Sequence, residues 1–173
     1  GSLGGAAAKK VQALGVHVIG VNRSGNSVDG CDEVVTTGKL DEVLKRADYL
    51  LASAPDTSET RGLMDKRRLN LLKPSAGVIN IGREAIMDYD ALCDMLDEGR
   101  LAGAILDVFD PEPIDSTSRL WDTKNLIIIY NITLIDTLDI RGDFICFKKG
   151  TRKKIRHRKA GKNTKCKVGS SCF

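Results

Sequence analysis

The sequence contains no apolar stretch near the ~20 residues that a membrane-spanning helix needs. Its first residues also lack a basic segment followed by an apolar run, so no export signal is indicated. The 5 cysteines are odd in number and never spaced as Cys-x-x-Cys, which argues against a zinc ribbon and a disulfide framework. We therefore expect a cytoplasmic protein with no membrane partner and no metal site.

The charge of the chain is unevenly distributed. Residues 1–140 hold 15 lysines and arginines against 22 acids, a net charge of −7, whereas residues 141–173 hold 12 basic residues and one acid, a net charge of +11. The composition, 42% hydrophobic and 29% charged, suits a chain that buries one core of ordinary domain size. We expect one globular domain over residues 1–133 and a basic, disordered tail over residues 134–173.

Helical and strand patterns alternate along the first half of the chain. A run of helix-forming residues predicts a helix over residues 4–14, ending at Gly15. Residues 17–21 are rich in β-branched side chains and predict a buried strand. Apolar residues with helical spacing follow at 40–44, and residues 49–53 predict the next strand.

The same alternation continues in the second half. Lys73-Pro74 ends a short helix, and Asp88 can cap a helix that ends at Gly99. Buried strands are predicted over residues 76–81, 104–109 and 126–129. This order predicts an α/β fold with a mostly parallel sheet, helices on both of its faces, and ligands bound at the carboxyl ends of its strands.

The chain opens on Gly1-Ser2-Leu3-Gly4, directly before an alanine-rich helix. These residues fit the end of a Gly-x-Gly-x-x-Gly loop, in which a glycine lets the backbone approach a pyrophosphate held by the helix N-terminus. The first glycine of that motif and its strand are absent. A Gly-x-x-Gly pattern alone is weak evidence, but a helix, a strand and a turn follow it in the order that a dinucleotide fold requires.

Ordered segments between Gly1 and about Asn131 resemble the nucleotide domain of the D-isomer-specific 2-hydroxyacid dehydrogenases. They are residues 54–62 (APDTSETRG), 72–76 (LKPSA), 80–83 (NIGR), 102–109 (AGAILDVF), 112–113 (EP) and 120–122 (LWD). The resemblance implies a Rossmann-type, doubly wound, mostly parallel sheet whose first strand is missing from this sequence, as is the family's substrate domain.

The resemblance also implies the site. In that family an arginine holds the substrate carboxylate, and a glutamate orients a histidine that exchanges a proton with the substrate oxygen; by resemblance Arg83 and Glu112 are the first two. A planar guanidinium suits a carboxylate, and a carboxylate beside an imidazole raises the imidazole pKa. The alternative is that both residues are ordinary solvated charges. Implied cofactor contacts are Gly1, Ser2, Leu3, Gly4, Asn22, Arg23, Ser24, Ala54, Pro55, Thr57, Ile81, Gly82 and Asp107.

Two residues depart from the family pattern. Asn131 stands at the position of the family histidine, and an amide cannot act as a general acid or base near neutral pH. Glu84 stands where the family has glycine, and its carboxylate could repel an anionic substrate or pair with Arg83. We do not expect His17 or His157 to replace the missing base.

The cofactor preference is read from Asn22-Arg23-Ser24, which follows the strand predicted over residues 17–21. An acid at this place binds the 2′-hydroxyl of NAD, whereas an arginine accepts the 2′-phosphate of NADP. NADP is therefore favoured over NAD, the alternative being an arginine that is merely exposed in a turn.

The basic segment over residues 148–159 fits two interpretations. It could bind phosphate backbones or act as a nuclear import signal, but it has no aromatic residue for stacking on bases. We favour a solvated extension without a nucleic-acid partner.

Two functions remain open. The favoured one is an NAD(P)-dependent oxidoreductase acting on the CH–OH group of 2-hydroxy acids, as an incomplete or inactive copy that takes a small 2-keto or 2-hydroxy acid and is compatible with a family-type homodimer. The alternative is a non-catalytic nucleotide-binding protein with a nucleic-acid-binding basic tail.

Overall fold

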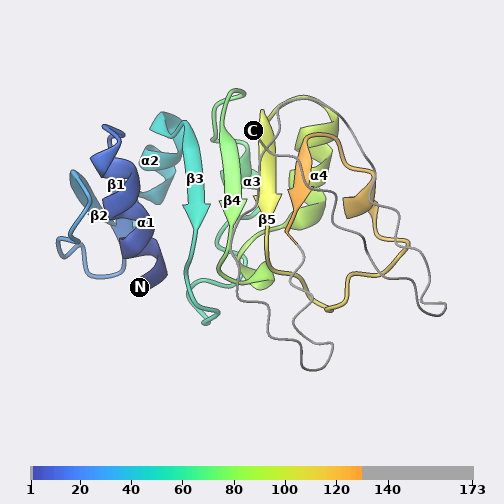
Figure 1. Ribbon diagram of the computed structural model, residues 1–173, viewed down its shortest axis with the longest axis horizontal. Helices are drawn as coiled ribbons and strands as arrows, with labels where there is room; N and C mark the ends of the chain where they lie inside the picture. The colour runs from blue at the N-terminus through green and yellow to red at the C-terminus, as the bar shows by residue number, and fades with distance from the viewer. Residues whose placement is uncertain (1, 130–173) are drawn as a thin grey trace, which may run out of the picture. The chain divides into compact units, whose positions relative to one another are not determined.

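The computed structural model describes residues 2–129, and the structural statements below concern that part of the chain. The elements follow in the order α1 (Ser2–Ala13), β1 (Ile19–Asn22), β2 (Glu33–Thr36), η1 (Thr37–Lys39), α2 (Leu40–Arg46), β3 (Tyr49–Ala52), α3 (Lys66–Leu69), β4 (Gly77–Asn80), η2 (Glu84–Ile86), α4 (Tyr89–Asp97), β5 (Gly103–Leu106), η3 (Arg119–Trp121) and β6 (Leu126–Ile128) (Figure 1). The tail predicted over residues 134–173 lies outside the described residues.

The strands form two parallel sheets. One sheet has the order β1-β2 and the other has the order β3-β4-β5-β6. In a doubly wound sheet of order 3-2-1-4-5-6, strand 1 lies between strands 2 and 4. Here β1 and β3 stand at the places of strands 2 and 4, and no described strand pairs with either of their facing edges. The predicted α/β, Rossmann-type fold is confirmed, and within the described residues the sheet is interrupted between β1 and β3.

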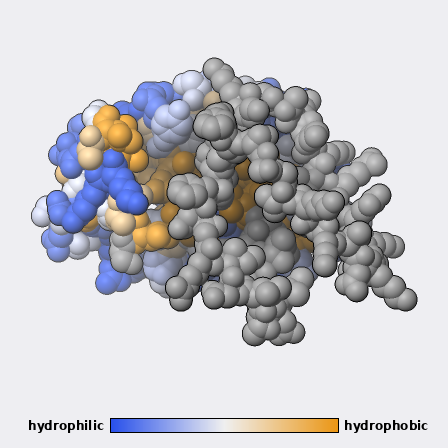
Figure 2. All heavy atoms as spheres, in the orientation of Figure 1, coloured by the Kyte–Doolittle hydropathy of each residue, from blue (hydrophilic) through white to orange (hydrophobic). Residues whose placement is uncertain are grey.

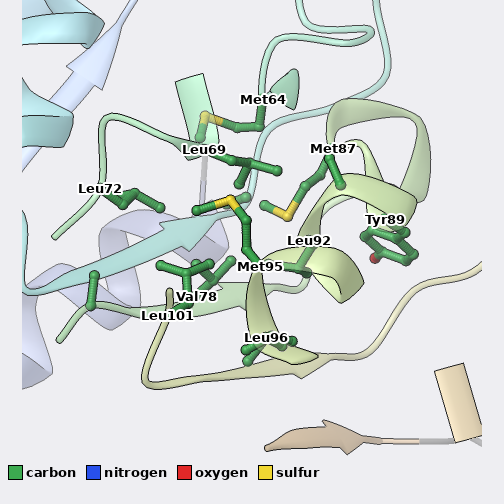
Figure 3. Close-up of a cluster of buried hydrophobic side chains, with 14 of the residues drawn as sticks. Met64, Leu69, Leu72, Val78, Met87, Tyr89, Leu92, Met95, Leu96 and Leu101 are labelled. Carbon is green, nitrogen blue, oxygen red and sulfur yellow. The ribbon is translucent and has the colours of Figure 1, made fainter. Parts of the chain in front are cut away.

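The hydrophobic core lies between one face of the four-stranded sheet and the helices α2, α3 and α4. Leu44, Leu69 and Leu92, one from each helix, are fully buried against sheet residues such as Val78 and Leu106. Figure 3 shows the leucine and methionine side chains of this cluster interlocked around Met95. Because side chains alternate between the faces of a strand, every second residue of β4 and β5 contributes to this core.

The opposite face of the same sheet has no described helix packed on it. Tyr49 is 76% exposed, Ile127 is 48% exposed and Leu51 is 38% exposed, while α3 and α4 lie behind the sheet in Figure 1. Among the described residues this face of the four-stranded sheet is therefore left without a helix. Helix α1 lies beside β1 and β2, so it does not reach β4, β5 or β6 (Figure 1).

Other predicted elements differ in detail from the observed ones. The strand expected over residues 17–21 is β1, but its residues are half-buried rather than buried, because this sheet has only two strands. Strand β2 was not predicted. Two end signals are confirmed: Gly15 has φ +80°, and the Asp88 side chain accepts a hydrogen bond from the Ala91 N–H at 2.9 Å.

On the face drawn in Figure 2, hydrophilic residues predominate over α1, β1 and β2, with a few hydrophobic side chains among them. No helix between residues 2 and 129 is long and apolar enough to cross a membrane.

Candidate functional site

The predicted site residues follow the carboxyl ends of four parallel strands. The segment 22–24 ends β1, 54–57 follows β3, 81–83 follows β4, and Asp107 follows β5. Two backbone bonds continue the ladder beyond the strands, from the Ile81 N–H to the Ala52 carbonyl and from the Asp107 N–H to the Asn80 carbonyl, each at 3.0 Å. These bonds keep the segments side by side at one edge of the sheet, where ligands bind in folds of this class.

The N-terminus of α1 lies beside the segment that follows β3. A Cβ atom on Gly4 would lie 2.5 Å from the Ser53 Oγ, so a larger residue at position 4 would force the Ser53 hydroxyl to turn away. No acidic residue stands in the first turn of this helix of 12 residues, which leaves its free N–H groups and positive dipole end suited to a phosphate. Ser2, Leu3 and Gly4 are all in α1, whereas Gly1 lies outside the described residues.

Asn22 shapes the turn after β1, and Arg23 projects from it. The Asn22 Oδ1 accepts hydrogen bonds from the Gly25 N–H at 2.6 Å and from the Ser24 hydroxyl at 3.3 Å. The Arg23 side chain is 80% exposed, and its Nη1 lies 3.4 Å from an oxygen of Glu59, in the loop after β3. Nothing in the amino-acid sequence indicates Glu59 as the partner of Arg23. An exposed arginine held by one surface carboxylate can exchange that carboxylate for a phosphate.

The loop after β3 is ordered by Thr60. Its hydroxyl donates to the Pro55 carbonyl at 2.6 Å and accepts from the Thr57 N–H at 2.9 Å. This loop lies against the segment after β4: a Cβ atom on Gly82 would lie 2.7 Å from the Ala54 carbonyl oxygen. Glycine at 82 therefore lets two predicted cofactor-contacting segments touch through their backbones.

Arg83 is exposed at the end of β4. Its guanidinium donates to the Gly82 carbonyl at 2.7 Å, and it forms no ion pair with Glu84 or with any other described residue. Glu84 is half-buried, and its pKa is raised by burial and then by the charge of Asp110, with a smaller opposing effect of Arg61. The sequence predicted that Glu84 either pairs with Arg83 or repels an anionic substrate. The pairing is not found, so repulsion of the substrate anion is the effect that stays a prediction.

Two carboxylates lie together after β5. The Asp107 Oδ1 atom is buried and has no hydrogen-bond partner, and burial, followed by the charge of Glu112, raises the pKa of Asp107. Glu112 is exposed, and its Oε1 accepts from the Phe109 N–H at 3.2 Å. A buried carboxylate oxygen without a donor is costly unless a ligand supplies one. This oxygen fits an N–H group such as that of a nicotinamide carboxamide.

Two further residues hold this edge together and were not singled out from the sequence. Asn80, the last residue of β4, is fully buried, and its amide bonds both the segment 81–83 and the hydroxyl of Tyr89. The sequence signal that could have identified Asn80 is an asparagine at the end of an apolar strand, because a buried amide needs several hydrogen-bond partners.

The predicted replacement of the family histidine, Asn131, lies outside the described residues, as does His157. His17 is exposed, with its Nδ1 3.7 Å from Asp32, and it precedes β1 at the amino end of that strand, away from this edge. Among residues 2–129 no group of three or more histidine, cysteine or acidic side chains could hold a metal ion.

Comparison with known proteins assigns the family. The profile described as D-isomer specific 2-hydroxyacid dehydrogenase, NAD binding domain, matches residues 1–130. A glyoxylate reductase of Thermococcus gammatolerans is 35% identical over 133 residues, which cover 76% of this chain and 39% of that protein.

Solved structures agree. A D-isomer specific 2-hydroxyacid dehydrogenase family protein from Aeromonas salmonicida has a TM-score of 0.71 and 38% identity, covering 74% of this chain and 41% of its own. An NADPH-dependent glyoxylate/hydroxypyruvate reductase from Sinorhizobium meliloti, in complex with NADP and sulfate, has a TM-score of 0.68 and 36% identity over 74% of this chain and 42% of its own. This chain thus spans about two fifths of the length of these relatives, and it belongs to the D-isomer specific 2-hydroxyacid dehydrogenase family through that family's NAD binding domain.

Proposed function

We propose that this chain supplies the nucleotide-binding part of an NAD(P)-dependent oxidoreductase that reduces 2-keto acids to 2-hydroxy acids. The observation that carries the proposal is the common location of three features at one sheet edge. These features are the acid-free N-terminus of α1, the exposed Arg83 without an ionic partner, and the buried, unpaired oxygen of Asp107 beside Glu112. Together they provide a phosphate site, a carboxylate site and an acceptor for an amide.

In this proposal each residue acts on a different part of the bound cofactor and substrate. The nicotinamide cofactor supplies the hydride when it is bound. The guanidinium of Arg83 binds the substrate carboxylate with two parallel hydrogen bonds, and Asp107 accepts an N–H bond that orients the nicotinamide ring. In a protein that has the proton-donating histidine, Glu112 orients its imidazole and favours the charged form of that ring.

Asn131 limits what this chain can do alone. An amide cannot deliver the proton that the substrate oxygen needs, and loss of a general acid typically costs ~10² to 10⁴ in rate. We therefore propose that the chain as it stands is an incomplete or inactive copy of the enzyme.

NADP is the proposed cofactor because Arg23 is exposed and faces a carboxylate that a 2′-phosphate can replace.

The test uses a completed protein, in which residues 1–129 of this chain replace the matching part of the Thermococcus gammatolerans glyoxylate reductase, and position 131 is histidine. Glyoxylate, hydroxypyruvate and pyruvate are offered with NADPH or NADH. We expect oxidation of the cofactor with at least one keto acid, and its loss in the Arg83→Gln variant. No oxidation with any of them, in a completed protein that is folded, would contradict the proposal.

The second candidate, a non-catalytic nucleotide-binding protein with a nucleic-acid-binding tail over residues 134–173, is favoured by Asn131 and by the basic composition of the tail. Binding to immobilised nucleotide and to nucleic acid at increasing salt separates the two candidate functions, because only binding through the tail falls steeply as salt rises.

We further propose a cytoplasmic location, a family-type homodimer, and a domain boundary near residue 133.

A further inference from the structure

Tyr89 lies between the two segments that carry the candidate catalytic residues. It is the first residue of α4, where the Asp88 cap fixes the start of the helix, and only 9% of it is exposed. Figure 3 shows its ring at the margin of the core cluster, beside Met87 and Leu92. The ring meets that of Phe109 edge to face, with 6.2 Å between the centroids. Because the ring of Tyr89 is packed on both sides, it is held in one position.

The hydroxyl of Tyr89 makes two hydrogen bonds of opposite direction. It accepts from the Asn80 Nδ2 at 3.0 Å and donates to the carbonyl of Val108 at 2.8 Å. Val108 follows Asp107 directly and lies two residues beyond the end of β5. Burial raises the pKa of the Tyr89 hydroxyl, which keeps its proton available for donation.

Asn80 extends this connection to Arg83. Its Nδ2 also donates to the Arg83 carbonyl at 3.0 Å, and its Oδ1 accepts from the Gly82 N–H at 3.1 Å. One amide proton thus serves Tyr89 and the other serves Arg83. A continuous path of hydrogen bonds, buried at its centre and part-buried at both ends, runs from the backbone of Arg83 through Asn80 and Tyr89 to the backbone of Val108.

The chemistry of the path requires a hydroxyl at Tyr89. Phenylalanine would keep the ring contacts but would leave a buried Asn80 N–H and the part-buried Val108 carbonyl without this partner, and an unmade hydrogen bond at a buried group is costly. Relief of that cost requires one of the two segments to move. The segment after β5 includes Phe109, whose N–H holds Glu112, so a shift at Val108 changes the place of Glu112 as well.

We propose that Tyr89 is a positioning residue, which fixes the spacing between Arg83 after β4 and the Asp107 to Glu112 segment after β5. The roles of Arg83 and Glu112 in this inference rest on the proposed function, but the spacing itself does not. Tyr89 touches neither substrate nor cofactor in this account and acts through Asn80 and Val108.

The first test is hydrogen exchange of the full 173-residue chain. Tyr89→Phe is compared with Tyr49→Phe, which removes the same atom from a tyrosine that is 76% exposed on the other face of the sheet. We expect faster exchange of the Gly82 and Phe109 amides, whose acceptors are the side chains of Asn80 and Glu112, in Tyr89→Phe only. Unchanged exchange of both amides in Tyr89→Phe would overturn the inference, whatever the activity of the protein.

The second test separates positioning from folding in the completed protein. Misplacement by about 1 Å can cost up to ~100-fold in rate, so we expect kcat/KM for the keto acid to fall between about 10-fold and 100-fold in Tyr89→Phe, with KM raised. Tyr49→Phe should match the parent. A lower kcat with unchanged KM, in proportion to the folded fraction, would show a structural role only and overturn the inference. Absence of turnover in the parent would instead contradict the proposed function, and the exchange result would still decide the role of Tyr89.

Discussion

The Nη1 atom of Arg23 lies 3.4 Å from the carboxylate of Glu59, so an ion pair joins the turn after β1 to the loop after β3 although their strands do not pair. Both side chains are largely exposed, and a pair of this kind contributes little to stability. The ion pair matters for cofactor binding because a 2′-phosphate can take the place of the Glu59 carboxylate beside Arg23. The phosphate is also negatively charged and is a stronger hydrogen-bond acceptor.

The first prediction concerns cofactor choice. Arg23→Ala should weaken NADPH binding to the completed protein by about 10-fold, the size of one lost hydrogen bond to a charged group, and leave NADH binding unchanged. Glu59→Gln should strengthen NADPH binding by a few fold, because it removes a competing negative charge. Fluorescence titration measures both. Equal weakening of NADPH and NADH by Arg23→Ala would show that Arg23 does not read the 2′-phosphate.

The second prediction concerns the contact between the segments after β3 and β4. Gly82→Ala places a methyl group 2.7 Å from the Ala54 carbonyl oxygen and should lower the free energy of unfolding by about 1–3 kcal/mol, as overpacking does. Gly5→Ala is the matched control, since a Cβ atom there meets nothing within 4 Å and helix propensity favours alanine by about 0.5–1 kcal/mol. Urea unfolding of the two variants should give shifts of opposite sign; a destabilised Gly5→Ala or a neutral Gly82→Ala would contradict the packing described.

The third prediction concerns acid stability. Arg67 and Arg68 donate to Asp41 at 2.6 and 2.9 Å and lower the pKa of Asp41 to about 2. Because this pKa is below that of the unfolded chain, the contribution to stability is present above pH ~4 and is lost as the pH falls towards 2. The difference in unfolding free energy between the parent and Asp41→Asn should therefore be constant near neutral pH and shrink below pH ~4. A difference that stays the same down to pH 3 would refute the assignment.

The fourth prediction concerns the substrate carboxylate. Arg83→Lys keeps the charge but loses the two-pronged geometry, so KM for glyoxylate in the completed protein should rise, and Arg83→Gln should raise it further. Glu84→Gly should lower KM, since it removes a negative charge from the neighbourhood of an anionic substrate. Initial rates at varied glyoxylate measure these effects. An unchanged KM in both Arg83 variants would place the carboxylate elsewhere.

The sequence predicted the order of elements well because local signals mark their ends. Gly15 and Asp88 are examples, since the backbone at each adopts the geometry that the residue type favours. Strand β2 went unpredicted because its four residues begin with the charged Glu33 and depend on pairing with β1. The uncovered face around Tyr49 was also missed, because exposure depends on which other elements are present.

For the site, the resemblance located Arg83, Gly82 and Asp107, and the parallel strands place them at one edge. The partners Glu59 and Tyr89 could not be predicted, since each contact joins residues from different loops or elements and depends on tertiary packing. Hydrogen-bond direction at Tyr89 is likewise a property of the folded chain.

The interrupted sheet of the described residues and Asn131 support the central proposal, that the nucleotide-binding site on this chain takes part in turnover only within the completed protein. The direct measurement is NADPH oxidation with glyoxylate by the 173-residue chain carrying Asn131→His and by the completed protein carrying histidine at 131. We expect no turnover from the first, because no described strand pairs with the facing edges of β1 and β3, and steady turnover from the second. Steady turnover by the single Asn131→His variant of the 173-residue chain, or none by a folded completed protein, would contradict the account.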